Sequence, residues 1–151
     1  MSHFCNGKYT DKIMKREEFQ INDLVRVWGK PYRVEAIGID GVALASDDER
    51  VIIRLEDLEG VKPIPISRDI LVREGFRVSS CGQGNQYWVA VRYIGKQGTM
   101  IKVFYGGSED MTYCIYSAAG ISIGGSVTYL HDLQHSLRAA RLYNIANSIR
   151  I

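Results

Sequence analysis

Two histidines near the C-terminus have the residue types, and nearly the arrangement, of a zinc-binding helix. The string HDLQH at residues 131–135 differs by one methylene from the metalloprotease motif H-E-x-x-H, with Asp132 in place of the Glu that acts as general base. A catalytic zinc also needs a third protein ligand and a sheltered open position. The other histidine, His3, lies in the polar N-terminal stretch, and no cluster of carboxylates follows the string. We therefore expect no metal site.

Helical periodicity gives the same answer for this histidine pair. A helix rotates by about 100° per residue, and the apolar residues of the segment recur at spacings that form one stripe. His131 and His135 lie about 140° or more from the centre of that stripe. The pattern predicts that both point away from the core, which would be formed by Leu130, Leu133, Leu137 and Ala140.

Other candidate chemistry in the sequence is weaker. The glycines of GQGNQY at 82–87 lack the third glycine and the following helix of a dinucleotide loop. Cys114 has no paired base in the sequence, and Asp47-Asp48-Glu49 offers too few oxygen ligands for calcium. The sequence therefore predicts a protein that is not an enzyme, has no catalytic residue and needs no cofactor.

Composition is ordinary for a globular protein and indicates no membrane association. The chain has 151 residues, of which 46% are hydrophobic and 24% charged, with a net charge of +2. No stretch approaches the roughly 18 apolar residues that span a bilayer, and the N-terminus lacks the apolar core of a secretory signal. Three cysteines without C-x-x-C spacing favour reduced thiols in the cytoplasm of the producing cell.

Charge is unevenly distributed along the chain. Residues 1–16 carry a net charge of +3, whereas residues 17–75 hold 8 basic and 13 acidic side chains. Residues 76–151 hold 7 basic and 3 acidic side chains. An anionic partner is therefore expected to avoid the middle region and, if present, to use the C-terminal region and the basic arm.

The first half of the chain has the pattern of a small β-barrel. After a loose basic arm over residues 1–16, four short, roughly alternating runs are separated by turn residues between 23 and 55. Residues 56–61 resemble one helical turn, and Pro63 and Pro65 favour an edge strand because neither can donate to a ladder. This layout predicts an SH3-like barrel over residues 17–66.

The second half, residues 67–151, is expected to form an α+β module. Ser67 is suited to cap a short helix that ends at Gly75. Strands are predicted at 76–81, 86–94, 99–105 and 110–117, joined by glycine-rich turns as an antiparallel meander. Ser126 can then cap a long final helix. The fold class is therefore mixed β and α+β, as a barrel followed by a helix–meander–helix module.

Four stretches of the chain resemble a group of small uncharacterised proteins carried by Bacteroides-type prophages and mobile elements. They are FQINDLVRV at 19–27, VKPIPIS at 61–67, ILVREGF at 70–76 and GSVTYLHDLQ at 125–134. The order and spacing of these stretches agree with that group, whereas His135 and the residues after it depart from the group's usual helix. The resemblance implies the two-part fold and a phage-like context, and it implies no activity.

The last of these stretches contains the motif helix positions Tyr129, His131, Asp132 and Gln134. We interpret them mainly as helix–sheet docking, in which Tyr129 packs and Gln134 or His131 hydrogen-bonds a loop carbonyl. The alternative interpretation is a binding site.

Alternation along two strands of the module suggests a candidate binding face. If the strands pair in the expected register, one side of the sheet would display aromatic, Met and basic side chains together. Such a set is typical of protein interfaces and could also stack single-stranded bases. The alternative is that the barrel or the final helix covers this face. The expected residues are Trp88, Arg92, Met100, Lys102 and Phe104.

From these features we expect a phage or mobile-element accessory protein that acts through an unknown protein partner or through self-association. A nucleic-acid-binding module that uses the C-terminal sheet and the basic arm is the alternative. The acidic barrel is not expected to bind polyanions.

Overall fold

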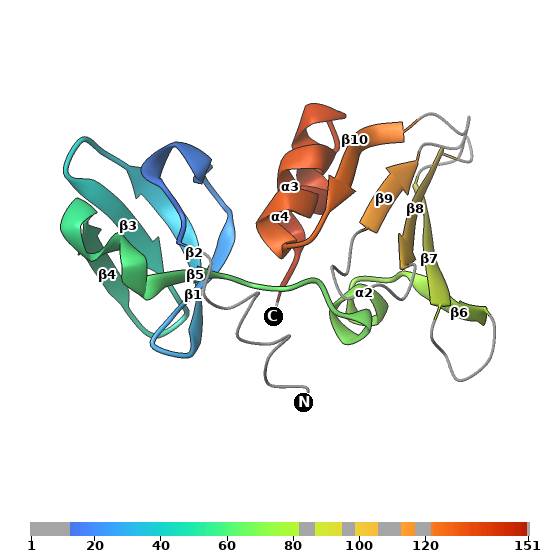
Figure 1. Ribbon diagram of the computed structural model, residues 1–151, viewed down its shortest axis with the longest axis horizontal. Coiled ribbons are helices and arrows are strands. Elements are labelled where there is room, and N and C mark those ends of the chain that lie inside the picture. Colours follow the sequence, from blue (N-terminus) through green and yellow to red (C-terminus); the bar gives the residue numbers. More distant parts are fainter. Residues whose placement is uncertain (1–12, 82–86, 95–98, 106–112, 117–121, 151) are drawn as a thin grey trace. The chain divides into compact units, whose positions relative to one another are not determined.

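The computed structural model describes residues 13–81, 87–94, 99–105, 113–116 and 122–150. The chain forms two compact units. The N-terminal unit comprises Met1–Pro65 and Tyr129–His131, and the C-terminal unit comprises Ile66–Thr128 and Asp132–Ile151. Each unit contains one five-stranded antiparallel sheet, so the expected mixed β and α+β class is confirmed (Figure 1).

The N-terminal unit is a curled sheet with strand order β4-β3-β2-β1-β5. Its one-turn helix η2 lies between β4 and β5, where the sequence predicts a helical turn. The edge position of β5 agrees with the prolines of that segment, because an edge strand tolerates a missing donor. The elements are η1 (Arg16–Glu18), β1 (Leu24–Val27), β2 (Lys30–Ile37), β3 (Gly41–Ala45), β4 (Arg50–Arg54), η2 (Leu55–Gly60) and β5 (Val61–Pro63).

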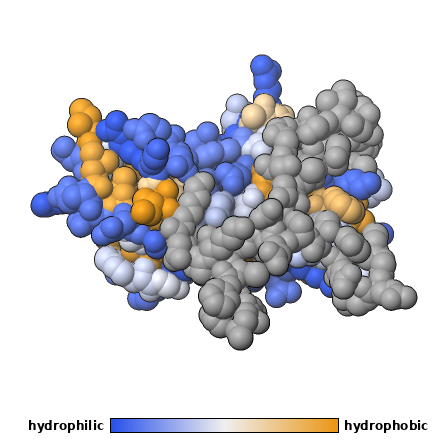
Figure 2. All heavy atoms as spheres, viewed as in Figure 1, coloured by the Kyte–Doolittle hydropathy of each residue, from blue (hydrophilic) through white to orange (hydrophobic). Residues whose placement is uncertain are grey.

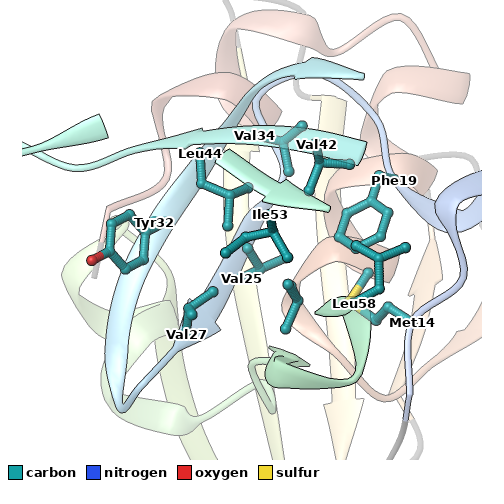
Figure 3. Packing of buried hydrophobic residues seen from close by; sticks show 11 residues of the cluster. Met14, Phe19, Val25, Val27, Tyr32, Val34, Val42, Leu44, Ile53 and Leu58 are labelled. Atoms are coloured by element: carbon teal, nitrogen blue, oxygen red, sulfur yellow. The ribbon is translucent and has the colours of Figure 1, made fainter. Parts of the chain in front are cut away.

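Alternating residues of these strands meet in one hydrophobic core (Figure 3). Strand pairing places Val25 opposite Tyr32 and Val42 opposite Ile53, and all four side chains are buried. Met14 joins the same core and is fully buried, although the sequence placed it in a loose arm. Its long apolar side chain gains more from burial than the polar residues around it, so the N-terminal unit extends at least to this residue.

A buried tyrosine braces the turn between β3 and β4. The Tyr32 hydroxyl donates a hydrogen bond to Glu49 Oε1. This bond, then burial and the negative charge of Glu49, raise the pKa of Tyr32 above its ordinary value of 10.0. The folded N-terminal unit therefore favours the protonated form of the Tyr32 hydroxyl.

The C-terminal unit is an antiparallel meander with helices. Its sheet order is β10-β9-β8-β7-β6, so each strand pairs with its neighbour in sequence. The expected meander is confirmed, but β10 is additional: Ser126 lies within that strand and does not cap a helix. Pairing with β9 keeps the segment extended there. The strands are β6 (Arg77–Cys81), β7 (Tyr87–Ile94), β8 (Thr99–Tyr105), β9 (Tyr113–Tyr116) and β10 (Ser122–Val127).

The first helix of this unit, α2 (Arg68–Arg73), begins and ends as its local sequence predicts. Ser67 Oγ accepts a hydrogen bond from the backbone N–H of Ile70 at 3.2 Å. Gly75 follows the helix with φ of +89°, a conformation that glycine adopts without steric penalty. The helix packs against β6 and β7 through a buried side that includes Ile70 and Leu71.

The predicted long final helix is wrong, because the chain forms two helices, α3 (Leu130–Ala139) and α4 (Tyr143–Ser148). Arg141 has φ of +65°, and the N–H of Leu142 bonds the carbonyl of Leu137 at 2.8 Å. The N–H of Arg141 bonds the carbonyl of Arg138, which completes a Schellman-type helix end. Glycine usually marks such an end, and its absence here explains why the sequence pattern gave no stop.

We predict that Gly41→Ala strongly destabilises the N-terminal unit. Gly41 has φ of +157°, and a Cβ there would lie 2.0 Å from the carbonyl oxygen of Ile53 on the paired strand. The free energy of unfolding should fall by roughly 3 kcal/mol in urea denaturation. Gly60→Ala is the matched control, since a Cβ at Gly60 meets open space. Equal stability of the two variants would contradict the described β3–β4 pairing.

A second prediction concerns high pH. Because the folded state raises the pKa of Tyr32, the stability from its hydroxyl is fully present below pH 10 and is lost as the pH rises through the folded pKa. Tyr32→Phe should lower the thermal unfolding midpoint at pH 7. It should also make the fall of that midpoint above pH 10 shallower. Tyr143→Phe, which alters an exposed tyrosine, should change neither quantity. A wild-type decline that persists unchanged in Tyr32→Phe would show that other groups cause it.

Candidate binding surface

The pairing of β7 with β8 decides which side chains of the C-terminal sheet share a face. Trp88 lies opposite Tyr105, whereas Phe104 lies opposite Val89. Since directly opposed residues share a face and successive residues alternate, Trp88 and Phe104 lie on opposite faces. The predicted binding face is therefore wrong: it assumed that even-numbered residues of the two strands face the same way. An odd register offset exchanges the faces of one strand.

Trp88 and Arg92 lie on the inner face. Trp88 is only 6% exposed and stacks on Tyr105 with ring centroids 5.2 Å apart. Arg92 is partly buried, and its Nε lies 3.9 Å from the position that a Cβ would take at Gly75, just after α2. The side chain of Met100 lies outside the described residues. The neighbouring inner residues Ala90, Ile101 and Val103 are fully buried.

The opposite side, here called the outer face, carries a different set of aromatic and basic groups. Tyr93 is 71% exposed and Phe104 is 40% exposed. Strand pairing forms one row from Arg77 through Val91 to Lys102 and a neighbouring row through Val89 to Phe104. The described residues of the outer face are Arg77, Ser79, Val89, Val91, Tyr93, Lys102 and Phe104.

The outer face is cationic as well as aromatic. The five strands β6 to β10 contain no Asp or Glu in their sequences. Arg77 and Lys102 flank Val91 at a distance of two strand spacings, about 10 Å. Lys102 and Phe104 were expected at a binding face, and the register keeps these two together and adds Arg77 and Tyr93. Because strand pairing decides this set, sequence alternation in single strands could not identify it.

The motif positions of α3 are mostly buried. Gln134 is fully buried, and its Nε2 donates to the carbonyl oxygen of Ala146 in α4 at 3.0 Å. Tyr129 is 8% exposed and stacks on His131, with ring centroids 5.9 Å apart. Asp132 is partly exposed. The Gln134 bond therefore joins α3 to helix α4, whereas the expected docking was to the sheet with a loop carbonyl as acceptor.

His131 is a correction to the helical-wheel analysis. The wheel predicted an exposed side chain, but His131 is 1% exposed, whereas His135 is partly exposed. The wheel considers one apolar stripe of an isolated helix, while the first two residues of α3, Leu130 and His131, belong to the N-terminal unit. There the N–H of Leu130 bonds the carbonyl of Ile64 at 2.6 Å. The start of α3 thus lies beside a segment distant in sequence, which the wheel of an isolated helix does not consider.

A further exposed aromatic residue, Trp28, was not identified from the sequence. Trp28 and Gly29 join β1 to β2 as a two-residue turn in which both residues have positive φ, +52° and +76°. Turns of this kind favour Asn-Gly or Gly-Gly, and a side chain such as tryptophan costs about 1 kcal/mol there. Trp28 is also 72% exposed, so burial does not offset that cost. The sequence signal that could have found it is a tryptophan directly before glycine at a predicted hairpin turn.

Exposed hydrophobic side chains also occur elsewhere on the N-terminal unit. Figure 2 shows them in the region where β3, β4 and η2 lie in Figure 1. Ile52 on β4 is 79% exposed, and Ile39 in the turn before β3 is 82% exposed. The apolar surface of this unit is therefore not restricted to Trp28.

We predict that the two histidines of α3 respond differently to replacement. His131→Ala should lower the free energy of unfolding by about 2 kcal/mol, because it leaves a cavity and removes the stacking on Tyr129. His135→Ala should change it by about 0.5 kcal/mol or less. Urea denaturation of both variants measures the difference. Equal, small effects would show that His131 is solvent-exposed.

Neither metal ligands among the described residues nor a comparison with known proteins defines a site. Among the residues that the structure describes, no three His, Cys, Asp or Glu side chains are grouped so that they could hold a metal ion. Within the same parts of the chain, no helix has both the length and the apolar character needed to cross a membrane. Comparison with protein-family models, curated proteins and solved structures found no match to this chain.

Proposed function

We propose that this chain is a non-enzymatic accessory protein that acts through protein–protein contacts or self-association. The outer face of the C-terminal sheet carries the proposal, because it presents exposed Tyr93 and Phe104 beside Arg77 and Lys102. Aromatic side chains and arginine are enriched in protein interfaces, where a few of them supply most of the binding energy. The outer face therefore offers exposed aromatic and basic side chains as anchors for a partner.

The charge of the outer face defines the kind of protein partner. Arg77 and Lys102 carry positive charge, and no acidic residue occurs in the sequences of the five strands. A partner surface with exposed carboxylates and a small apolar area would complement it.

The wider setting of the proposal rests on the fold and on the resemblance. The strand order β4-β3-β2-β1-β5, with η2 before β5, supports an SH3-like barrel for the N-terminal unit. The resemblance of residues 19–27, 61–67, 70–76 and 125–134 to proteins of Bacteroides-type prophages supports a phage or mobile-element origin. Three cysteines without C-x-x-C spacing support the cytoplasm of a bacterial host as the location.

Single-stranded nucleic acid is the second candidate for the same outer face. Tyr93 lies two rows along the sheet from Phe104, about 14 Å away, with the cationic row between them. Bases stack on exposed aromatic rings, and flanking basic groups attract the phosphates. This candidate uses the C-terminal sheet, and the acidic turns of the N-terminal unit have no part in it.

We predict that a Tyr93→Ala, Phe104→Ala double variant loses binding while keeping its fold. Both side chains are exposed, so the free energy of unfolding should change by about 0.5 kcal/mol per site or less. Two quantities should fall at least about tenfold, as expected for the loss of two anchors. One is retention of a protein partner from nuclease-treated host-cell extract, and the other is self-association measured by sedimentation. Tyr143→Ala, an exposed tyrosine on α4, is the matched control.

The same variants separate the two candidates. Binding to nucleic acid is measured by the fluorescence anisotropy of a labelled 15-nucleotide single strand. If the double variant loses this binding but keeps its nuclease-resistant protein partner, the outer face binds nucleic acid. Unchanged behaviour of the double variant in all three measurements would show that the outer face is not a binding surface.

A further inference from the structure

The strands of the N-terminal unit carry most of their charge on one side of the sheet. Figure 3 shows Val25, Val34 and Leu44 directed into the core, and strand pairing places the residues between them on the opposite side. The sequences of β1 to β5 contain six basic residues, of which Lys30 lies opposite the buried Val27 and so belongs to the core side. We call the opposite side the cationic face; its basic members are Arg26, Arg33, Arg50, Arg54 and Lys62.

Strand pairing spreads these cations across the whole sheet. Arg26 on β1 lies opposite Lys62 on β5, so the two are one strand spacing apart, about 5 Å. Arg33 on β2 and Arg50 on β4 both lie opposite Ala45 on β3, which separates them by two strand spacings, about 10 Å. Arg50 is exposed, and the other three cations are partly exposed. From β5 to β4 the array covers four strand spacings, about 19 Å along the sheet.

Little negative charge opposes the cations on this face. Glu35 is the acid in the sequences of the five strands, and its Oε1 lies 3.2 Å from Nη2 of Arg50. Five cations against one acid leave the cationic face with a net charge of +4. The other acids of residues 17–75 lie outside the strands, among them those at 47–49 in the turn before β4 and at 56–59 in η2. The negative charge of that whole region therefore does not describe this face.

Arg26 has a donor that the folded chain does not use. Its Nε is buried and has no hydrogen-bond partner among the described residues. A buried donor without an acceptor destabilises the folded state. An oxyanion that binds a guanidinium group from the side accepts hydrogen bonds from two of its nitrogens together, so such a ligand would satisfy this donor. The unused donor is independent of the charge count, and it also indicates an anionic ligand.

The composition of the cationic face favours a nucleic-acid duplex over an acidic protein or an unpaired strand. Protein interfaces have an apolar core. Among the described members of this face, Ile52 is the exposed large apolar side chain, at 79%, and its neighbours across β3 include the small Ala43. The same set contains no aromatic ring on which an unpaired base could stack. A duplex has its bases already stacked and carries one negative charge per roughly 1.7 Å of its axis, so a broad cationic array can contact several phosphates.

We propose that the cationic face binds the phosphate backbone of double-stranded nucleic acid without reading its sequence. Arg26 and Lys62 contact phosphates where β1 pairs with β5, and Arg50 and Arg54 contact them at the β4 edge. This surface is separate from the outer face of the C-terminal sheet, and its ligand is independent of any protein partner bound there.

The probe for the test is a fluorescently labelled DNA duplex of about 20 base pairs, titrated with the full-length protein at salt concentrations between about 0.05 and 0.2 M. Arg54→Gln with Lys62→Gln, which removes a cation from each edge strand, should weaken binding about tenfold. It should also reduce the slope of log affinity against log salt by about 2, because two fewer phosphates are neutralised. Arg26→Gln alone should weaken binding about threefold. A second duplex of unrelated sequence should give the same affinities, because phosphate contacts carry no sequence information.

A matched control separates a defined surface from general attraction between charges. Arg68→Gln with Arg73→Gln removes the same charge from exposed positions of α2 in the C-terminal unit, and it should change the affinity less than about twofold. Urea denaturation establishes that both double variants keep the stability of the wild type. If Lys62→Gln destabilises the fold, Arg54→Gln alone, at an exposed position, should still weaken binding about threefold.

Equal losses from the two double variants would show that only net charge matters and would overturn the proposal. A loss produced instead by Arg77→Gln with Lys102→Gln would place duplex binding on the outer face of the C-terminal sheet. Two further probes are a labelled single strand of the same length and a labelled peptide of alternating glutamate and serine. Tighter binding of either probe than of the duplex, lost in the Arg54→Gln, Lys62→Gln variant, would show that the cationic face takes unpaired bases or an acidic protein instead.

Discussion

Strand register in the C-terminal sheet is the constraint on which its whole surface depends. Because successive side chains alternate, pairing Trp88 with Tyr105 sends the tryptophan inward and leaves Phe104 on the outer face. The same pairing places Lys102 beside Val91 and leaves Tyr93 largely exposed. A shift of β7 by one residue would turn Tyr93 inward and Trp88 outward while Phe104 on β8 kept its side, so the register specifies both the core and the proposed binding face.

Local placement of charge matters more than the total in each unit. In the N-terminal unit, the sequences of β1 to β5 contain six basic residues and one acid, Glu35, whereas the acids of residues 47–49 and 56–59 lie in a turn and in η2. The net charge of residues 17–75 therefore describes no single surface. The C-terminal strands have no acids, so the charge of the outer face comes from Arg77 and Lys102.

The polar residues of α3 show how a helix acquires buried sides beyond its apolar stripe. Gln134 satisfies its amide with the Ala146 carbonyl, so its burial leaves that donor paired. His131 stacks on Tyr129, which directly precedes α3, and both residues belong to the N-terminal unit. These contacts explain why positions that suggested a zinc ligand or a binding motif are structural.

The sequence by itself determined the features that depend on neighbouring residues: the short strands and turns of the N-terminal unit, the Ser67 cap, the Gly75 helix end and the meander order. Tertiary structure alone decided which faces of β7 and β8 meet solvent, the burial of His131 and the end of α3 at Arg141. The physical reason is that capping and turn preferences act over a few residues. Register, burial and helix termination without glycine depend on pairing and packing with segments that no local pattern specifies.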